Sequence, residues 1–157
     1  MASATKPNPD SYRRVTPCLI VQGGDKALKF YADVFEATER MRFPNPDGTV
    51  AHAEIDIGDS VLIVEEESPE QGTKAPPTDG RPGSPAFLYV YVEDVDDVVA
   101  RAVKLGAQLQ RPPQDQFYGD REGYIIDPFG HGWTIATHVE DVEPAELMRR
   151  MAGMQGV

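Results

Sequence analysis

Residues 50–64 read VAHAEIDIGDSVLIV, two apolar runs joined by a glycine and an aspartate. In the first run apolar residues alternate with polar ones that include His52 and Glu54, which is the period of a half-buried strand. The Gly58-Asp59 pair suits a two-residue hairpin turn, so residues 61–64 are predicted to return as an antiparallel strand. The pattern predicts a strand with one apolar face and one polar face that carries His52 and Glu54.

Upstream of this hairpin the chain supplies a strand, a helix and one further strand. The apolar run 15–22 predicts a buried strand that ends at two glycines. Residues 27–35 carry apolar side chains at helical spacing, with Asp25 as the expected N-terminal cap. Residues 38–43 are expected to be extended, and residues 45–48 (NPDG) have turn chemistry. The first half therefore has the order β-α-β-β-β.

A linker separates this half from a second copy of the same order. Residues 69–85 hold five prolines and show no hydrophobic period. Beyond them, residues 86–93 predict a strand and residues 95–103 a helix that ends at Gly106. Three extended segments follow at 108–111, 117–126 and 132–137, and residues 127–130 (DPFG) form a turn before the last one. Element order, more than residue identity, indicates a duplicated unit.

The whole chain is predicted to form one domain in five parts. These parts are a flexible arm over 1–14, the first module over 15–68, the linker over 69–85, the second module over 86–139, and a C-terminal helix with its tail over 140–157. Pro144 suits the first position of that last helix. The apolar stripe of the helix consists of Leu147, Met148, Met151 and Met154.

Length and composition exclude several classes of protein. The 157 residues, 40% hydrophobic and 26% charged, are sufficient for a globular core. A net charge of −11 repels phosphate groups, so nucleic acids and anionic membranes are not expected partners. The one cysteine, Cys18, cannot form an intrachain disulfide. No apolar run is long enough to span a membrane, and residues 1–10 lack an apolar signal core, so we expect a cytoplasmic protein.

Several short segments indicate a family. Residues 27–31 (ALKFY), the strand end 89–94 and the turn 127–130, together with the repeat, resemble the vicinal-oxygen-chelate superfamily over residues 15–138. That superfamily includes glyoxalase I, bleomycin-resistance proteins and extradiol dioxygenases. Four segments are similar to its PhnB-like branch: 52–54 (HAE), 57–60 (IGDS), 115–121 (DQFYGDR) and 127–138 (DPFGHGWTIATH). The resemblance implies an α+β fold in which two paired β-α-β-β-β modules curl their mixed sheets into a cup.

The resemblance also implies where a metal would bind. Glyoxalase-type members hold a divalent metal through four side chains, one from the first strand and one from the last strand of each module. The matching positions in this chain are Thr16, Ile63, Phe87 and Thr134. None of these residues is a good metal ligand, because two are apolar and two are lone hydroxyls. We therefore predict that the protein binds no metal and no other cofactor.

A relocated metal site is the alternative. His52 and Glu54 lie two apart on one strand face, and Glu65 and His138 close the last strand of each half. Imidazole and carboxylate groups of this kind could converge on a divalent metal. The other interpretation of these four residues is that they are polar groups at the rim of the cup and at solvated strand ends.

Aromatic residues are expected to line the cup. Strand parity places Phe87 on the cup side together with two tyrosines of residues 86–93. In the segment 115–121 two aromatic rings would stack on a ligand and an arginine would fix its charge. The residues predicted to bind a ligand are Tyr89, Tyr91, Phe117, Tyr118 and Arg121. The alternatives are tyrosines that only fill the core and a strand entry with an Asp120–Arg121 surface pair.

Two further residues are predicted to be structural. Trp133 has the opposite parity from Thr134, so it is expected in the core against the helix. Cys18 has no basic neighbour in the sequence that would lower its pKa, so it is expected to be a buried and unreactive thiol.

These interpretations favour a metal-independent protein that binds a small aromatic or peptide-like molecule, or that carries an unassigned activity. Its candidate catalytic residues are His52, as a proton carrier, and Glu54, as a base. The alternatives are a metal-dependent lyase, isomerase or dioxygenase with its site near these two residues, and a structural module. The sequence leaves open whether the chain is an enzyme and which ligand it takes. The resemblance and the open sheet edges lead us to expect a homodimer.

Overall fold

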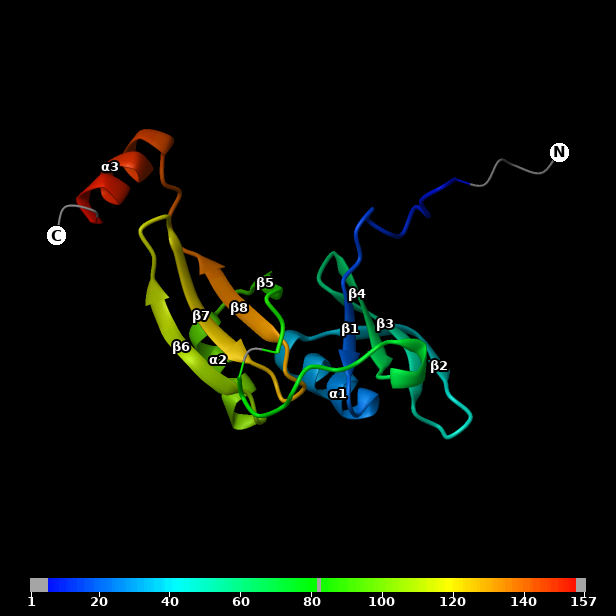
Figure 1. The fold of residues 1–157 in the computed structure, drawn as a ribbon. Coiled ribbons are helices and arrows are strands. Elements are labelled where there is room, and N and C mark those ends of the chain that lie inside the picture. The colour runs from blue at the N-terminus through cyan, green and yellow to red at the C-terminus, as the bar shows by residue number, and fades with distance from the viewer. Residues whose placement is uncertain (1–5, 82, 155–157) are drawn as a thin grey trace. The chain divides into compact units, whose positions relative to one another are not determined.

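The computed structural model describes residues 6–81 and 83–154, and the chain divides into two compact units, Met1–Pro76 and Pro77–Val157. The boundary between the units falls inside the stretch predicted as a linker. Each unit holds one four-stranded sheet with one helix, and a further helix ends the second unit (Figure 1). Within the described ranges, no helix is long and apolar enough to cross a membrane.

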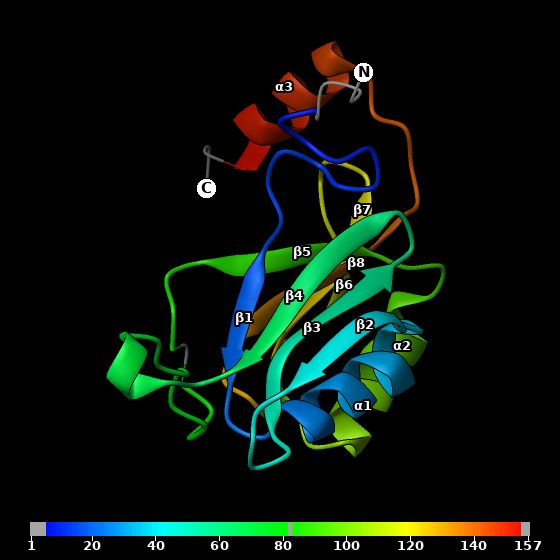
Figure 2. The ribbon, with the colours of Figure 1, turned by 90° about the vertical axis from the view of Figure 1, so that its right-hand side faces the viewer.

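The first unit has the predicted β-α-β-β-β order. Its elements are β1 (Cys18–Val21), α1 (Gly24–Phe35), β2 (Thr38–Pro44), β3 (Val50–Ile57) and β4 (Ser60–Glu66), followed by a 3-10 turn, η1 (Pro69–Gln71). The strands lie in the order β1-β4-β3-β2, as Figure 2 shows. β1 is parallel to β4, and the other pairs are antiparallel. The predicted Gly58-Asp59 turn joins β3 to β4.

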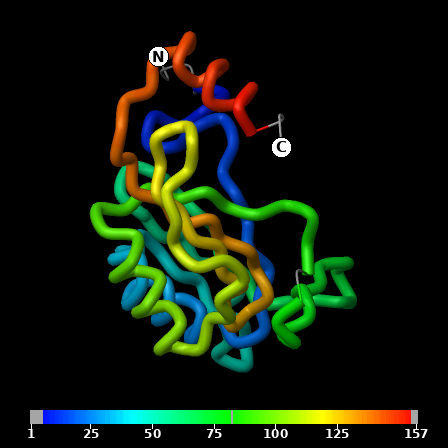
Figure 3. Tube along the Cα trace, turned by 90° about the vertical axis from the view of Figure 1, so that its left-hand side faces the viewer, coloured from blue at the N-terminus to red at the C-terminus, as the bar shows by residue number. Residues whose placement is uncertain are grey.

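The second unit repeats this arrangement. Its elements are β5 (Phe87–Tyr91), α2 (Val95–Lys104), β6 (Gln108–Asp115), β7 (Asp120–Ile126), β8 (Gly132–His138) and α3 (Pro144–Met154). The strand order is β5-β8-β7-β6, again with one parallel pair, β5 with β8. Figure 3 follows the chain through this unit from α2 to α3. The predicted α+β fold of two such modules with a C-terminal helix is confirmed.

Each sheet buries one face against its own helix. In β3, Ala53 and Ile55 are buried, as the alternation of the sequence predicts. Trp133 in β8 is 1% exposed, and its Nε1 donates a hydrogen bond of 2.9 Å to the buried carboxylate of Asp127. The prediction that Trp133 belongs to the core is therefore confirmed. Burial of an indole requires such a partner for its N–H group.

A carboxylate from the last strand of the first unit caps α1. Asp25 was expected to be the cap, and this expectation is wrong because the helix begins at Gly24 and Asp25 already lies in its first turn. The Glu66 carboxylate on β4 accepts hydrogen bonds from the backbone N–H groups of Gly23 (2.7 Å) and Gly24 (2.8 Å). It thus satisfies donors that have no partner inside the helix.

In the second unit, the start of α2 is also capped from the last strand, at the position that corresponds to Glu66. Thr137 on β8 accepts a hydrogen bond of 2.9 Å from the backbone N–H of Val95, the first residue of α2. The Thr137 hydroxyl in turn donates to the carbonyl oxygen of Val92 at 3.0 Å. In both units the last strand therefore fixes where the helix begins.

The two helices end on left-handed residues of different kinds. Gly106 follows α2 with φ 106°, as the predicted role of this glycine requires. Glu36 follows α1 with φ 56°, and among the described residues it is the one non-glycine with a positive φ. A side chain in this conformation costs roughly 1 kcal/mol.

The C-terminal helix α3 lies past the end of the β6–β7 hairpin (Figure 1). Arg150 of this helix donates to the carbonyl oxygen of Phe117 at 3.1 Å and pairs with Glu140 at 2.7 Å. The helix begins at Pro144, as predicted. Its methionine side chains are exposed, with Met148 at 67% and Met154 at 64%.

Candidate functional site

The face of the second sheet that does not meet α2 carries aromatic rings above buried acidic groups. Register places Tyr89 beside Thr134, Thr134 beside Tyr124, and Ala136 beside Glu122. We call this surface the tyrosine face and define it by Phe87, Tyr89, Tyr91, Asp120, Glu122 and His138. Its aromatic side chains are 43–61% exposed, whereas Asp120 and Glu122 are only 5% and 6% exposed. The alternation along residues 86–93 had predicted that Phe87, Tyr89 and Tyr91 share this face.

Hydrogen bonds join the tyrosines to the two acidic groups. The Tyr89 hydroxyl lies 2.8 Å from Glu122 Oε2 and 3.0 Å from Asp120 Oδ2. The Tyr91 hydroxyl donates to the same Asp120 oxygen at 2.8 Å. His138 Nδ1 lies 2.7 Å from the other Asp120 oxygen. Tyr89 has one proton for two carboxylates, so this network has fewer donors than its acceptors can use.

The charges on this face shift several pKa values. Burial acts to raise the pKa of Asp120, but hydrogen bonds from His138, Tyr91 and Tyr89 outweigh it and the pKa is lowered. The hydrogen bonds to Asp120 and Asp141 raise the pKa of His138. Burial and the two carboxylates raise the pKa of Tyr89. At neutral pH the face therefore presents Asp120 as a carboxylate and Tyr89 as a neutral phenol.

The segment expected to form the lip of the cup divides between the two sides of the sheet. Phe117 and Tyr118 pack edge to face, with ring centres 5.1 Å apart. Burial and the carboxylate of Glu122 raise the pKa of Tyr118 to about 12.

Arg121 lies elsewhere, and its expected place beside the tyrosines is wrong. Its guanidinium pairs with Asp96 in the first turn of α2 at 2.6 Å and with Asp115 at 3.0 Å. Its neighbour Asp120 points to the opposite side, so these two residues do not form the surface pair considered as an alternative. The charge of Arg121 is engaged by two carboxylates on the helix side of the sheet.

The corresponding face of the first sheet carries a histidine between two carboxylates. His52 Nδ1 lies 2.8 Å from Glu65 Oε1, and His52 Nε2 lies 3.2 Å from Glu54 Oε1. Glu54 is 6% exposed. We call this surface the His52 face and define it by Tyr12, Arg40, His52, Glu54 and Glu65. The structure thus brings together the two residues predicted as catalytic, and it joins them to Glu65.

The ionisation of this histidine and carboxylate is coupled. The hydrogen bond to Glu65 raises the pKa of His52 although partial burial opposes the shift. Burial acts to raise the pKa of Glu54, but the hydrogen bonds from Tyr12 and His52 dominate and lower it. His52 therefore keeps its proton to a higher pH than an ordinary imidazole does.

Cys18 lies at the same side of this sheet, and it is exposed, so the expected burial is wrong. Partial desolvation and the nearby Glu65 carboxylate raise the pKa of its thiol to about 11. Because the thiolate is the reactive form, the group is unreactive at neutral pH, for an electrostatic reason and not because it is buried.

The residues at the metal positions of the superfamily do not fit a metal. Ile63 lies opposite Cys18 in the pairing of β1 with β4, Phe87 lies on β5, and Thr134 is buried in β8. Residue Thr16 precedes β1, which begins at Cys18. Two of the four side chains have no donor atom, and a hydroxyl is a poor ligand. Within residues 6–81 and 83–154, no three His, Cys, Asp or Glu side chains are grouped so that they could hold a metal ion.

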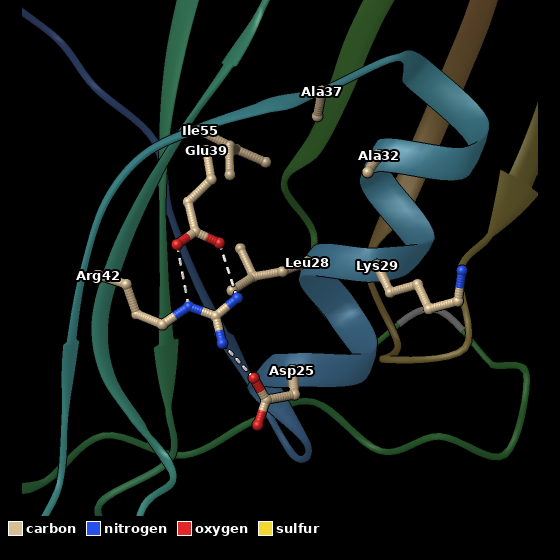
Figure 4. A pocket seen from close by; sticks show the side chains of 8 residues that line it. All are labelled: Asp25, Leu28, Lys29, Ala32, Ala37, Glu39, Arg42 and Ile55. Atoms are coloured by element: carbon tan, nitrogen blue, oxygen red, sulfur yellow. Dashed lines mark hydrogen bonds and ion pairs between the residues drawn. The ribbon is translucent and has the colours of Figure 1, made fainter.

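A small pocket of about 210 Å³ lies on the helix side of the first unit, between α1 and β2 (Figure 4). Arg42 is its central charge, and Figure 4 shows its guanidinium between Glu39 and Asp25. Arg42 pairs with Glu39 at 2.7 Å and also with Asp25. Because both carboxylates already neutralise this cation, the pocket offers little to a charged ligand.

Sequence reasoning missed several residues of the two faces. Tyr12 was assigned to a flexible arm, and Arg40 was not singled out, yet both contact Glu54. Asp120 was considered only as a surface partner of Arg121, and Glu122 was not singled out. Alternation along β7 could have found the last pair, because residues 120 and 122 share one face with Tyr124. No local signal marks Tyr12.

Curated relatives of the chain are uncharacterized proteins. One from Mycobacterium bovis is 33% identical over 139 residues, which cover 88% of this chain and 91% of the relative. Another, from Mycobacterium tuberculosis, is 33% identical over 139 residues, which cover 88% of this chain and 82% of the relative. These proteins extend the sequence family without assigning an activity to it.

Solved structures share the fold. TioX from Micromonospora sp. ML1 is 26% identical, with a TM-score of 0.62 over 81% of this chain and 99% of TioX. A PhnB protein from Bacillus cereus is 18% identical, with a TM-score of 0.62 over 80% of this chain and 99% of that protein. The fosfomycin resistance protein FosX from Listeria monocytogenes is 16% identical, with a TM-score of 0.59 over 86% of this chain and 97% of FosX. The last two likenesses show the fold alone.

The family follows from the sequence itself. A family model described as the Glyoxalase/Bleomycin resistance protein/Dioxygenase superfamily matches residues 13–135, most of both units. The structural neighbours, which include a PhnB protein, agree with this match. The predicted resemblance is confirmed: the chain belongs to the glyoxalase/bleomycin resistance protein/dioxygenase superfamily.

Proposed function

We propose that this protein binds a small aromatic molecule on the tyrosine face, without a metal. One observation carries the proposal: three aromatic side chains stand 43–61% exposed on one sheet face, directly beside two carboxylates that are almost fully buried. Exposed rings on a sheet face provide stacking area at a small cost in side-chain entropy. Buried carboxylates that can accept more hydrogen bonds than their present donors supply provide fixed acceptors. The surface therefore suits a planar ring that carries a hydrogen-bond donor.

The charge of the tyrosine face narrows the chemical class of the ligand further. Asp120 and Glu122 lie on the same strand, and His138 is the basic group nearest to Asp120, at 2.7 Å. Arg111 approaches Glu122 only to 3.9 Å. An anionic ligand would meet two carboxylates, whereas a neutral or cationic donor would satisfy them. A planar aromatic amine is therefore the expected class of ligand.

Metal independence is part of the proposal. Its support is the donor set at the superfamily's metal positions, where Ile63 and Phe87 offer no ligand atom. The alternative is a metal-dependent lyase, isomerase or dioxygenase with a relocated site at His52 and Glu54. Metal analysis of protein purified without chelator tests both. About one tightly bound divalent metal per chain, lost in the His52→Ala variant, would favour the alternative.

A titration with 9-aminoacridine, a planar aromatic cation, tests the ligand site. Phe87→Ala should weaken binding roughly 2- to 10-fold, because one stacking contact is worth about 0.5–1.5 kcal/mol. The matched control is Phe43→Ala on β2, since Phe43 and Phe87 are both 58% exposed. Equal losses in the two variants, or no binding by the unmodified protein, would contradict a ligand site on the tyrosine face.

We also propose that the protein is a homodimer. The support is that each four-stranded sheet is open, with β5 and β6 at the edges of the second one, and that the methionine stripe of α3 is exposed. Exposed edges and apolar helix faces favour association. Light scattering over a range of concentrations tests this, and a monomer throughout would refute it.

A further inference from the structure

The segment before β1 places a tyrosine on the His52 face. The Tyr12 hydroxyl donates a hydrogen bond of 2.5 Å to Glu54 Oε2. The guanidinium carbon of Arg40 lies 4.8 Å from the centre of the Tyr12 ring, within range of a cation–π contact. Arg40 also donates to the carbonyl oxygen of Ser11 at 3.4 Å. A ring and its hydroxyl are thus each held by a separate charged group.

The buried carboxylate of Glu54 requires hydrogen-bond donors, and a hydroxyl can supply one. It is 6% exposed, and a buried carboxylate is stable only with donors around it. His52 supplies one contact at 3.2 Å, and Arg40 approaches only to 3.9 Å. The Tyr12 hydroxyl makes the shortest contact of the three. The acceptor is therefore built to take a hydrogen bond from an additional group.

The two charged groups together select one kind of ligand. Glu54 accepts from a protonated hydroxyl and repels an ionised one, and its proximity raises the pKa of Tyr12 accordingly. Arg40 attracts the face of an aromatic ring. A ring without a hydroxyl satisfies only Arg40, and an aliphatic alcohol satisfies only Glu54. Both are satisfied by a neutral phenol.

Tyr12 is delivered by a segment outside the sheet. Residues 13–17 connect it to β1 and belong to no helix or strand. The described polar contacts of this segment with the sheet are those of Tyr12 and Ser11, an exposed pair between Arg13 and Asp59 at 3.9 Å, and a hydrogen bond of 2.9 Å from the Ile63 N–H to the carbonyl oxygen of Pro17 directly before β1. A side chain held by few contacts on a short tether competes with free ligands as if present at millimolar concentration. It can therefore be displaced.

We propose that Arg40, His52 and Glu54 form a binding site for an external phenol, and that Tyr12 is its intramolecular occupant. A ligand must displace Tyr12 to bind. The site consists of residues of the first unit and shares no residue with the tyrosine face, so it stands or falls independently of the proposed function.

The test is a titration with 4-methylphenol, which has the same ring and hydroxyl as a tyrosine side chain, followed by ¹H–¹⁵N NMR. Tyr12→Ala should tighten binding about 10-fold, since removal of a competing hydrogen bond to a charged group is worth about 1.4 kcal/mol or more. Tyr12→Phe should tighten it less, because its ring can still stack on Arg40. Chemical shifts should change at the amides of His52 and Glu54.

Three controls make the result decisive. Asp10→Ala, which removes a carboxylate that pairs with Lys6 in the same segment, should leave the affinity unchanged. Adding Glu54→Gln to Tyr12→Ala should lose most of the gain. The ether 4-methylanisole, which has no hydroxyl proton, should bind every variant weakly.

Two outcomes would overturn the proposal. One is equal affinity of the unmodified protein and Tyr12→Ala for 4-methylphenol. The other is shift changes confined to the tyrosine face, which would support the proposed function and remove the phenol site. Spectra of each folded variant establish that an unchanged affinity is not a folding defect.

Discussion

Replacing Tyr89 by phenylalanine should destabilise the second unit. The change removes one hydroxyl that lies 2.8 Å from Glu122 and 3.0 Å from Asp120, and it leaves the ring in place. Both carboxylates are almost fully buried, and the lost donor leaves them less satisfied. Leaving a buried acceptor without its partner costs about 1–3 kcal/mol.

The expected magnitude lies in the lower part of that range. Tyr89 is 43% exposed, so water can replace part of the lost donor, and we expect about 1–2 kcal/mol. For a chain of this length that corresponds to a fall in Tm of roughly 2–8 °C. Tyr91→Phe is the matched control. Tyr91 is 61% exposed, and its hydroxyl donates to Asp120, which keeps His138, so its cost should be below 1 kcal/mol.

Urea unfolding followed by tryptophan fluorescence measures this difference in stability within the second unit. The chain has one tryptophan, and Trp133 lies in β8, beside β5, where its side chain is 1% exposed. Loss of Trp133 burial therefore reports the second sheet directly.

The pH dependence has a definite sign. Hydrogen bonds lower the pKa of Asp120 in the folded state, so their stabilisation is present above the ordinary pKa of 3.8 and is lost as the pH falls through the folded value. The difference between Tyr89→Phe and the unmodified protein should be largest near neutral pH and shrink in acid. A cost equal to that of Tyr91→Phe, or one that grows in acid, would refute the reasoning.

Three further predictions concern the first unit. Glu36→Gly should stabilise the protein by up to about 1 kcal/mol in urea unfolding, because glycine accepts φ 56° without strain; a loss of stability would show that the left-handed residue is not strained. Glu66→Ala should cost about 1–2 kcal/mol, since it removes both acceptors at the start of α1, and urea unfolding measures the loss. His52→Gln should cost more at about pH 5.5 than at about pH 8.5, because the raised pKa of His52 gives stability that is present below the ordinary value of 6.5 and is lost as the pH rises through the folded value; equal costs at both would contradict the ion-pair assignment.

Local periodicity was sufficient to predict the elements of the fold. The alternation over 50–57 gave β3 with its observed bounds, and the helical spacing up to residue 35 gave the end of α1. Turn chemistry at Asn45 and Gly58 was equally informative, since these positions need particular backbone angles whatever surrounds them. Such signals depend only on residues that are close together in the sequence, so they can be identified without the tertiary structure.

Residue contacts on the open faces could not be predicted in the same way. Arg121 was expected to bind the ligand because of its place in the segment 115–121 and the family resemblance, and the two isoleucines at 125 and 126 leave the parity of β7 ambiguous. Only the pairing of Tyr124 with Thr134 decides that Asp120 and Glu122 share the face and that Arg121 does not. Charged residues are expected to be solvated, so buried carboxylates were not expected here.

The sequence by itself determined the duplicated β-α-β-β-β order, the family and the absence of ligand side chains at the superfamily's metal positions. The tertiary structure decided which donors reach which carboxylates. Tyr12 reaches Glu54 across 42 positions of sequence, and Tyr89 reaches Glu122 across 33. The physical reason is that strand period acts along the chain, whereas a hydrogen bond on a sheet face depends on register between strands and on how a connecting segment lies over them.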